Sequence, residues 1–170
     1  MGSIGRILDA IATAFSRAGG VVIVLMMAHI TADVAAKALF ASPIHGTLEI
    51  TAVYYMVALV FLPLAHVTAG EGHIKVELFT QKLSRRPMLA LETFIALVGA
   101  FYVGAMAIGS IDEALFRTMI KDTLETAEGT LEVWPSRWIV PVGTGAMALY
   151  LIYEACRTGR SVLSDPKDTL

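Results

Sequence analysis

The amino-acid sequence predicts an all-α integral membrane protein with four transmembrane helices, an N-terminal amphipathic helix and an interfacial segment between spans two and three. Apolar residues make up 56% of the 170 positions and charged residues only 16%, whereas about a quarter of the residues in a soluble domain are charged. Four apolar stretches approach or exceed the roughly 20 residues that a membrane-crossing helix needs. The connections between them are too short for a second, soluble domain.

The N-terminal region has the pattern of a helix that lies on a membrane surface. Its apolar residues recur at helical spacing, and its charged residues fall elsewhere on the helical wheel. The apolar set is Ile4, Ile7, Leu8, Ile11 and Phe15, and the charged set is Arg6, Asp9 and Arg17. We expect an amphipathic helix over residues 1–18, a bend at Gly19 and Gly20, a membrane domain over 19–157 and a cytoplasmic tail over 158–170.

The four spans are bounded by turn signals, acids and aromatic residues. They are expected at Val21 to Phe40, Leu48 to Val67, Met88 to Ile111 and Ile139 to Tyr153. A turn-like segment at 41–46 separates the first two. A segment rich in acids at 112–132 precedes Trp134 and Trp138, whose indoles suit the headgroup level of a membrane.

The segment after span two is polar and basic but carries an apolar side. Gly70 and Gly72 allow a sharp exit from the helix, and His73 can bind backbone groups that are freed there. Leu78 and Phe79 supply an apolar side that would let this segment lie flat in the interface. We interpret it as a brace on the membrane surface, with no contact to a substrate.

The basic residues predict the orientation. With both termini and the middle connection on one side, nine Lys and Arg residues gather there: Arg6, Arg17, Lys75, Lys82, Arg85, Arg86, Arg157, Arg160 and Lys167. Only four lie on the other side: Lys37, Arg117, Lys121 and Arg137. Basic residues favour the cytoplasmic side of a membrane. We therefore expect the N- and C-termini to be cytoplasmic and the acid-rich segment to face outward.

A polar stripe interrupts the first span. His29, Asp33 and Lys37 stand four residues apart, so they share one face of a helix, near its middle in the case of His29. Because a charge in the bilayer is costly, this face should contact protein or water. We interpret it as a seam toward a partner subunit with an internal Asp33 and Lys37 ion pair, and we add Glu49, at the start of span two, to this seam. A proton or ion relay is the alternative.

Small residues and prolines give further hints about packing. Ala96, Ala100 and Gly104 repeat every four residues in the third span, which would let a neighbouring helix approach closely. Pro63 and Pro141 each remove a backbone donor inside a span, so both positions predict a kink.

Several classes of function lack support in the residues. The sequence has no phosphate-binding loop, no His-Glu-x-x-His motif and no nucleophile elbow, so we expect no enzyme activity. A net charge of −2 argues against nucleic acid as a partner, and Cys156 alone cannot form an internal disulfide. Two alternatives stay open: a haem-binding four-helix anchor using His29, and a small proton-coupled exporter using Asp33.

Two short runs resemble a known transporter family. Pro43-Ile44-His45-Gly46-Thr47-Leu48-Glu49-Ile50 lies between the first two spans, and Gly70-Glu71-Gly72-His73-Ile74-Lys75-Val76-Glu77-Leu78-Phe79 follows the second. With Trp134-Pro135 before a Gly-rich last span, they resemble the small membrane subunit (Q component) of tripartite ATP-independent periplasmic (TRAP) transporters. The resemblance covers about residues 20–157. Where this family often has Arg before the first outer turn, this chain has Lys37.

The resemblance implies a scaffold without a cofactor of its own. In this family a periplasmic binding protein captures an organic acid, and a large membrane subunit moves it together with sodium. The small subunit supports the large one in the bacterial inner membrane. Sodium is therefore expected in the large partner. The basic residues Lys75, Lys82, Arg85 and Arg86 would anchor phospholipid headgroups; a solvated, purely structural set of charges is the alternative.

Overall fold

The computed structural model describes residues 3–70, 85–126 and 129–164. Within these residues four helical stretches are long and apolar enough to cross a membrane: Ile4–Phe40, Thr47–Ala69, Arg86–Met119 and Trp134–Val162. The prediction of a helical membrane protein with four spans is confirmed.

The first helix, α1 (Ser3–Phe40), is continuous over 38 residues, so the predicted bend at Gly19 and Gly20 is wrong. Gly19 serves close packing instead, because a Cβ atom there would lie 3.1 Å from Cγ of Pro63 in the second span. Gly20 has open space beside it. Residues 3–18 therefore extend the first span as one straight helix, about 57 Å long by the α-helical rise.

The second span, Thr47–Ala69, is assembled from four pieces: α2 (Thr47–Ile50), a five-residue π-helix η1 (Thr51–Tyr55), α3 (Met56–Phe61) and α4 (Leu64–Ala69). Pro63 interrupts the helix between α3 and α4, as its missing N–H predicts. The amides of His66 and Val67 both donate to the Pro63 carbonyl oxygen, at 2.9 and 3.0 Å. The predicted irregularity at Pro63 is confirmed.

The third and fourth spans are longer than predicted, and a small sheet joins them. Span three is α5 (Arg85–Met119), and span four is formed by α6 (Trp134–Arg137) and α7 (Ile139–Ser164). Between them β1 (Thr123–Thr126) pairs antiparallel with β2 (Gly129–Glu132). The sequence did not predict this hairpin. Pro141 lies in the first turn of α7 and does not break the helix, because a proline is tolerated there.

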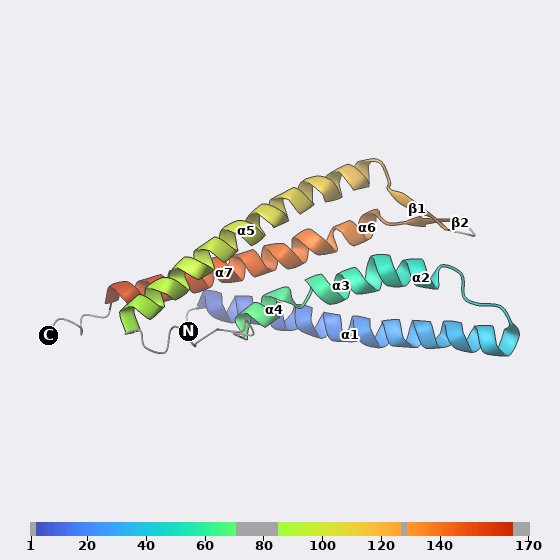
Figure 1. Cartoon of the computed structure of the whole chain (residues 1–170), viewed down its shortest axis with the longest axis horizontal. Coiled ribbons are helices and arrows are strands. Elements are labelled where there is room, and N and C mark those ends of the chain that lie inside the picture. The colour runs from blue at the N-terminus through green and yellow to red at the C-terminus, as the bar shows by residue number, and fades with distance from the viewer. Residues whose placement is uncertain (1–2, 71–84, 127–128, 165–170) are drawn as a thin grey trace.

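The four spans lie in one row rather than in a closed bundle. Figure 1 shows α1 at one edge, then span two, then α7, and α5 at the other edge. The residue contacts agree for most of the row, since α5 packs mainly on α7, α7 on α3 and α4, and these on α1; in addition, the first turns of α1 touch α7 directly. The N-terminal end of α1 and the C-terminal end of α7 lie toward the same end of the row, where α7 extends beyond α1, and the β-hairpin lies toward the other end (Figure 1).

The best-packed contact is that between α5 and α7. Ala100 and Val103 of α5 meet Ala148 and Leu151 of α7 in a small buried cluster. Ala96 is buried as well, so this part of the predicted small-residue stripe does form a helix contact. Gly104, by contrast, faces open space, because the buried face of α5 continues through Val103 rather than Gly104.

Candidate functional site

His29, the first residue of the predicted polar seam of α1, contacts another residue of the same chain. Nδ1 of His29 lies 3.3 Å from the hydroxyl oxygen of Tyr55 in η1. The two rings meet edge to face, with centroids 5.8 Å apart and planes at 89°. His29 thus joins α1 to the π-helical part of span two. A π-helical turn shifts the side chains that follow it around the helix axis, and this turn ends at Tyr55.

The second residue of the stripe holds the connection between the first two spans. Oδ1 of Asp33 accepts a hydrogen bond of 2.6 Å from the backbone N–H of Ile44. The hydroxyl of Thr47 donates to the Ile44 carbonyl oxygen at 3.0 Å, and Gly46 adopts the left-handed conformation, φ 75°, just before α2. Asp33 therefore fixes the path by which the chain turns from α1 into span two.

The predicted ion pair between Asp33 and Lys37 does not form within the residues that the structure describes. Lys37 is exposed, whereas Asp33 is partly buried and directs a carboxylate oxygen to Ile44. The backbone N–H is a better-placed partner than a flexible lysine one helical turn away. Glu49 is partly buried at the start of span two. The role of these residues toward a partner subunit stays a prediction.

Two consecutive tyrosines relate the position of His29 along the molecule to that of the β-hairpin. Tyr55 contacts His29, and the hydroxyl of Tyr54 donates to the backbone carbonyl oxygen of Glu132 at 2.6 Å. His29 therefore lies level with the base of the β-hairpin. The chain from 30 to 50, which we call the projecting tip, extends beyond this level. From His29 to Phe40 it reaches about 16 Å by the helical rise.

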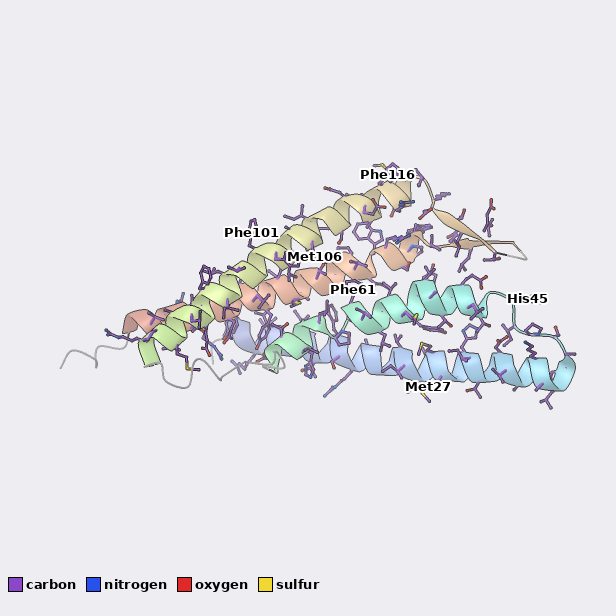
Figure 2. All side chains as sticks on the ribbon, viewed as in Figure 1. Met27, His45, Phe61, Phe101, Met106 and Phe116 are labelled. Carbon is purple, nitrogen blue, oxygen red and sulfur yellow. The ribbon has the colours of Figure 1, made fainter. Side chains whose placement is uncertain are left out.

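The projecting tip is apolar although it lies beyond the hairpin base. Val34, Leu39, Phe40 and Leu48 are 60%, 76%, 77% and 82% exposed. The edges of the row are apolar too: Met27 projects from α1 and Phe101 from α5 on opposite sides (Figure 2). Large apolar side chains exposed in this number indicate contact with lipid or protein.

An ionic cluster braces the end of the molecule that carries the β-hairpin. Oδ2 of Asp122 lies 3.4 Å from Nη1 of Arg117 and 3.9 Å from Nη2 of Arg137. Glu113 pairs with Nε of Arg117 at 2.6 Å. Backbone hydrogen bonds from Asp122 to Arg117 and from Val133 to Asp122, both 3.0 Å, close the base of the hairpin. The hairpin is thus tied to both α5 and α6.

Away from the hairpin, the first turns of α1 pack against the middle of α7. The hydroxyl of Tyr150 donates to Oδ1 of Asp9 at 3.2 Å, and Gly5 lies directly against the ring and hydroxyl of Tyr153. Ala12 is almost completely buried, with 1% of its surface exposed. These contacts explain why residues 3–18 continue straight rather than turn aside.

Comparison with protein families decides the identity of the chain. Residues 26–160 match the DctQ component of tripartite ATP-independent periplasmic transporters. The chain belongs to the DctQ family. A DctQ subunit is a transporter component and not an enzyme, and this family works in a complex with a large membrane component and a periplasmic binding protein. Searches of individual curated proteins and of solved structures give no match.

The predicted lipid-anchoring residues of this DctQ chain are only partly within the described structure. Gly72, His73, Lys75, Leu78, Phe79 and Lys82 lie outside the described residues. Arg85 begins α5, and Arg86 is partly buried in its first turn. Among the described residues, no three His, Cys, Asp or Glu side chains gather closely enough to hold a metal ion.

Sequence reasoning missed the cluster around Asp122 and the junction at Tyr54. It treated residues 112–132 only as an acidic outer segment. The alternation of Arg117, Asp122 and Arg137 in the sequence was a weak signal that acids and bases meet there. The bond from Tyr54 to Glu132 joins positions 78 residues apart and leaves no local trace in the sequence.

Proposed function

We propose that this DctQ subunit is the scaffold of a sodium-coupled TRAP transporter. In this proposal the large membrane subunit binds sodium and moves an organic acid anion, and a periplasmic binding protein delivers that anion. The small subunit holds the large one in position in the bacterial inner membrane.

The arrangement of the spans as a single row carries this proposal. A closed ring of helices can enclose a polar path, whereas the described helices stand side by side, and their broad faces are left to the surroundings (Figure 1). In the most apolar 18-residue stretch of each of the first two spans, only 11% is buried within the chain, and in the third span 17%. A flat, apolar row offers contact area to a partner but no enclosed route for an anion.

The interface with the large subunit is proposed to include the projecting tip and the polar stripe. His29 and Asp33 position the tip through Tyr55 and Ile44, while the exposed Lys37 and the partly buried Glu49 remain on its surface. The periplasmic binding protein is soluble and binds only transiently. A permanent partner subunit is therefore better suited to cover the exposed apolar side chains of the projecting tip.

The proposed orientation places both termini in the cytoplasm. The N-terminal end of α1 and the C-terminal end of α7 share one end of the row (Figure 1), which an even number of spans requires. The excess of basic residues on that side supports the cytoplasmic assignment. The basic residues Lys75, Lys82, Arg85 and Arg86 are proposed to bind phospholipid headgroups there.

Copurification and transport by separated components test the scaffold. The chain should copurify in equal amounts with a much larger polytopic protein and should transport nothing when reconstituted alone. The three-component system should take up an organic acid only with a sodium gradient. Uptake by the small subunit alone would overturn the proposal, and a Soret band in the purified chain would point to a haem anchor.

A further inference from the structure

Each span contains a stretch without Asp, Glu, Lys or Arg, and the midpoint of that stretch marks the bilayer centre for its helix. A charged side chain is costly near the bilayer centre and is better tolerated near the surfaces. The four stretches are residues 18–32, 50–70, 93–111 and 138–153. Their midpoints are Leu25 in α1, Val60 in span two, Tyr102 in α5 and the bond between Gly145 and Ala146 in α7. The contacts between helices show whether these midpoints are level along the row.

The midpoints of α1 and span two are nearly level. His29 and Tyr55, which are in contact, lie four and five residues from their midpoints toward the end of the row that carries the hairpin. Gly19 and Pro63, which also meet, lie six and three residues from them toward the other end, which we call the terminal end. Either contact leaves a difference of less than one helical turn.

The midpoint of α7 is displaced toward the terminal end. Phe61 lies one residue past the midpoint of span two in that direction, whereas Gly143, which touches it, lies two and a half residues before the midpoint of α7. This displacement is about 5 Å by the helical rise. The bond between Tyr150 and Asp9 gives a larger displacement of the same sense, since Tyr150 is four and a half residues past its midpoint and Asp9 is 16 residues past that of α1.

The midpoint of α5 is displaced further in the same direction. Gly99 and Leu151, which pack together, lie three and five and a half residues past their midpoints toward the terminal end, so α5 adds about 4 Å. Trp138 and Thr118, which are hydrogen-bonded near the hairpin, indicate the same sense. Figure 1 shows the stagger: α1 reaches beyond α5 at one end of the row, and α5 and α7 reach beyond α1 at the other.

A stepwise displacement across a flat row means that the bilayer plane is not perpendicular to the helices. From α1 to α5 the glycine contacts give a total of about 9 Å, over three helix spacings of roughly 8–10 Å each. The four midpoints reach one plane when the row is inclined by about 20° within its own plane, and the larger displacements from side-chain contacts require more. Membrane helices tilt by up to about 40°, so this inclination is within their ordinary range.

The charged residues that bound the stretches favour the inclined placement. Arg17 and Asp112 are exposed, and an upright row, whose midplane would be a compromise among the four helices, would bring both of them closer to the membrane centre. Inclination brings Asp33 closer instead. Oδ1 of Asp33 already accepts the N–H of Ile44, and a hydrogen-bonded polar group costs less to bury.

We propose that the lipid bilayer crosses the row obliquely, with the helices inclined by at least about 20° within the plane of the row. Acyl chains then cover α1 on its hairpin side as far as Asp33, and α5 on its terminal side as far as Glu92. Ile30 of α1 and Leu97 of α5, which are 38% and 54% exposed, lie in these two regions at diagonally opposite corners of the row. This placement concerns the chain itself and does not depend on the scaffold role.

Depth measurements with spin labels test the inclination. Cys156 is replaced by Ser, and single cysteines that carry a nitroxide are introduced at exposed positions of the full chain, which is reconstituted in vesicles of phosphatidylethanolamine and phosphatidylglycerol. The positions are Val21, Leu25 and Ile30 on α1 and Leu97, Tyr102 and Met106 on α5. Collision rates with oxygen, which concentrates in hydrocarbon, and with a water-soluble nickel chelate report the depth of each label.

The inclined row places the greatest depth at the middle position of each helix, Leu25 and Tyr102, with shallower labels on both sides. An upright row moves each maximum by about three residues or more, so depth would increase steadily toward Val21 on α1 and toward Met106 on α5. That result would overturn the proposal. Low collision rates with both reagents at Ile30 and Leu97 would show cover by protein rather than acyl chains, and would also overturn it.

Circular dichroism of each labelled variant checks that the helices are intact. If the label at a middle position lowers the helical content, the neighbouring exposed position takes its place, Val24 for Leu25 or Phe101 for Tyr102. Because the chain is measured without the large subunit, the outcome is separate from that of the copurification experiment.

Discussion

Gly143 of α7 lies directly against the backbone carbonyl oxygen of Phe61, the last residue of α3 before the Pro63 interruption. A Cβ atom at Gly143 would overlap this oxygen and the adjoining carbonyl carbon. Because Gly19 of α1 meets Pro63, three spans come together around one break in the second. The absence of side chains at Gly143 and Gly19 is what permits this approach.

Gly143→Ala should therefore destabilise the chain. A methyl group at this position requires α7 to move away from span two, and forcing extra volume into a packed site costs about 1–3 kcal/mol. We expect a lower thermal midpoint for the purified chain in detergent. Gly145→Ala is the matched control, since Gly145 has nothing within 4 Å of the added Cβ. An equal decrease of the thermal midpoint in both variants would contradict the close contact between Gly143 and Phe61.

Tyr55→Phe isolates the hydrogen bond between α1 and span two. It keeps the ring contact with His29 but removes the hydroxyl, so the expected loss of stability is about 0.5–1.5 kcal/mol. Chemical or thermal unfolding in detergent measures it. Tyr102→Phe on α5, where the side chain is 66% exposed, should be nearly neutral and serves as the reference.

Asp33→Ala should loosen the connection between the first two spans. The N–H of Ile44 loses its carboxylate acceptor, so hydrogen exchange in a peptide covering 41–50 should become faster. Asp33→Asn keeps an oxygen at the same place and should stay close to the unmodified chain. Lys37→Ala should leave this exchange unchanged; if it matches Asp33→Ala, the ion pair predicted from helical spacing exists after all.

Asp122→Asn should release the base of the β-hairpin. Arg117 and Arg137 lose the carboxylate that lies between them, so the hairpin loses its ionic attachment to α5 and α6, a small effect for solvent-exposed pairs. Trypsin should then cut more rapidly after Lys121, which is exposed. Glu125→Gln, on the exposed side of β1, should not change the cleavage rate, because it removes a charge without disturbing this cluster.

Topology reporters test the proposed orientation. Fusions at the C-terminus should report the cytoplasm, and an insertion at Glu125 in the hairpin should report the periplasm, because basic residues concentrate at the terminal end. A fusion at Ser84, between the second and third spans, should also report the cytoplasm. A periplasmic signal at Ser84 would be incompatible with four spans in this order.

The spans were predictable because their signal is local and repeated. Some 20 apolar residues in succession have few alternatives to a membrane helix, and Pro63 breaks a helix wherever it lies inside one. Helix ends were less predictable: α7 continues past the apolar stretch to Ser164 through a polar segment.

The remaining differences arise from contacts between distant parts of the chain. A glycine at position 19 is compatible with a helix bend or with the close approach of a neighbouring helix. The contact with Pro63, which is 44 positions away, decides between the two. Asp33 had two possible partners, and the folded connection supplied the nearer one in Ile44. The β-hairpin has short strands without apolar alternation, so its formation depends on α5, α6 and Tyr54.

The unbroken course of α1 has a mechanical consequence for the complex. A single helix held at Asp9 by Tyr150 and at His29 by Tyr55 resists bending, since curvature would have to break one of these attachments. Its two ends must then move together across the membrane. A partner helix that moves along α1 during transport would therefore meet a rigid surface. A force on one end of α1 would be transmitted to its other end, in the opposite leaflet of the bilayer.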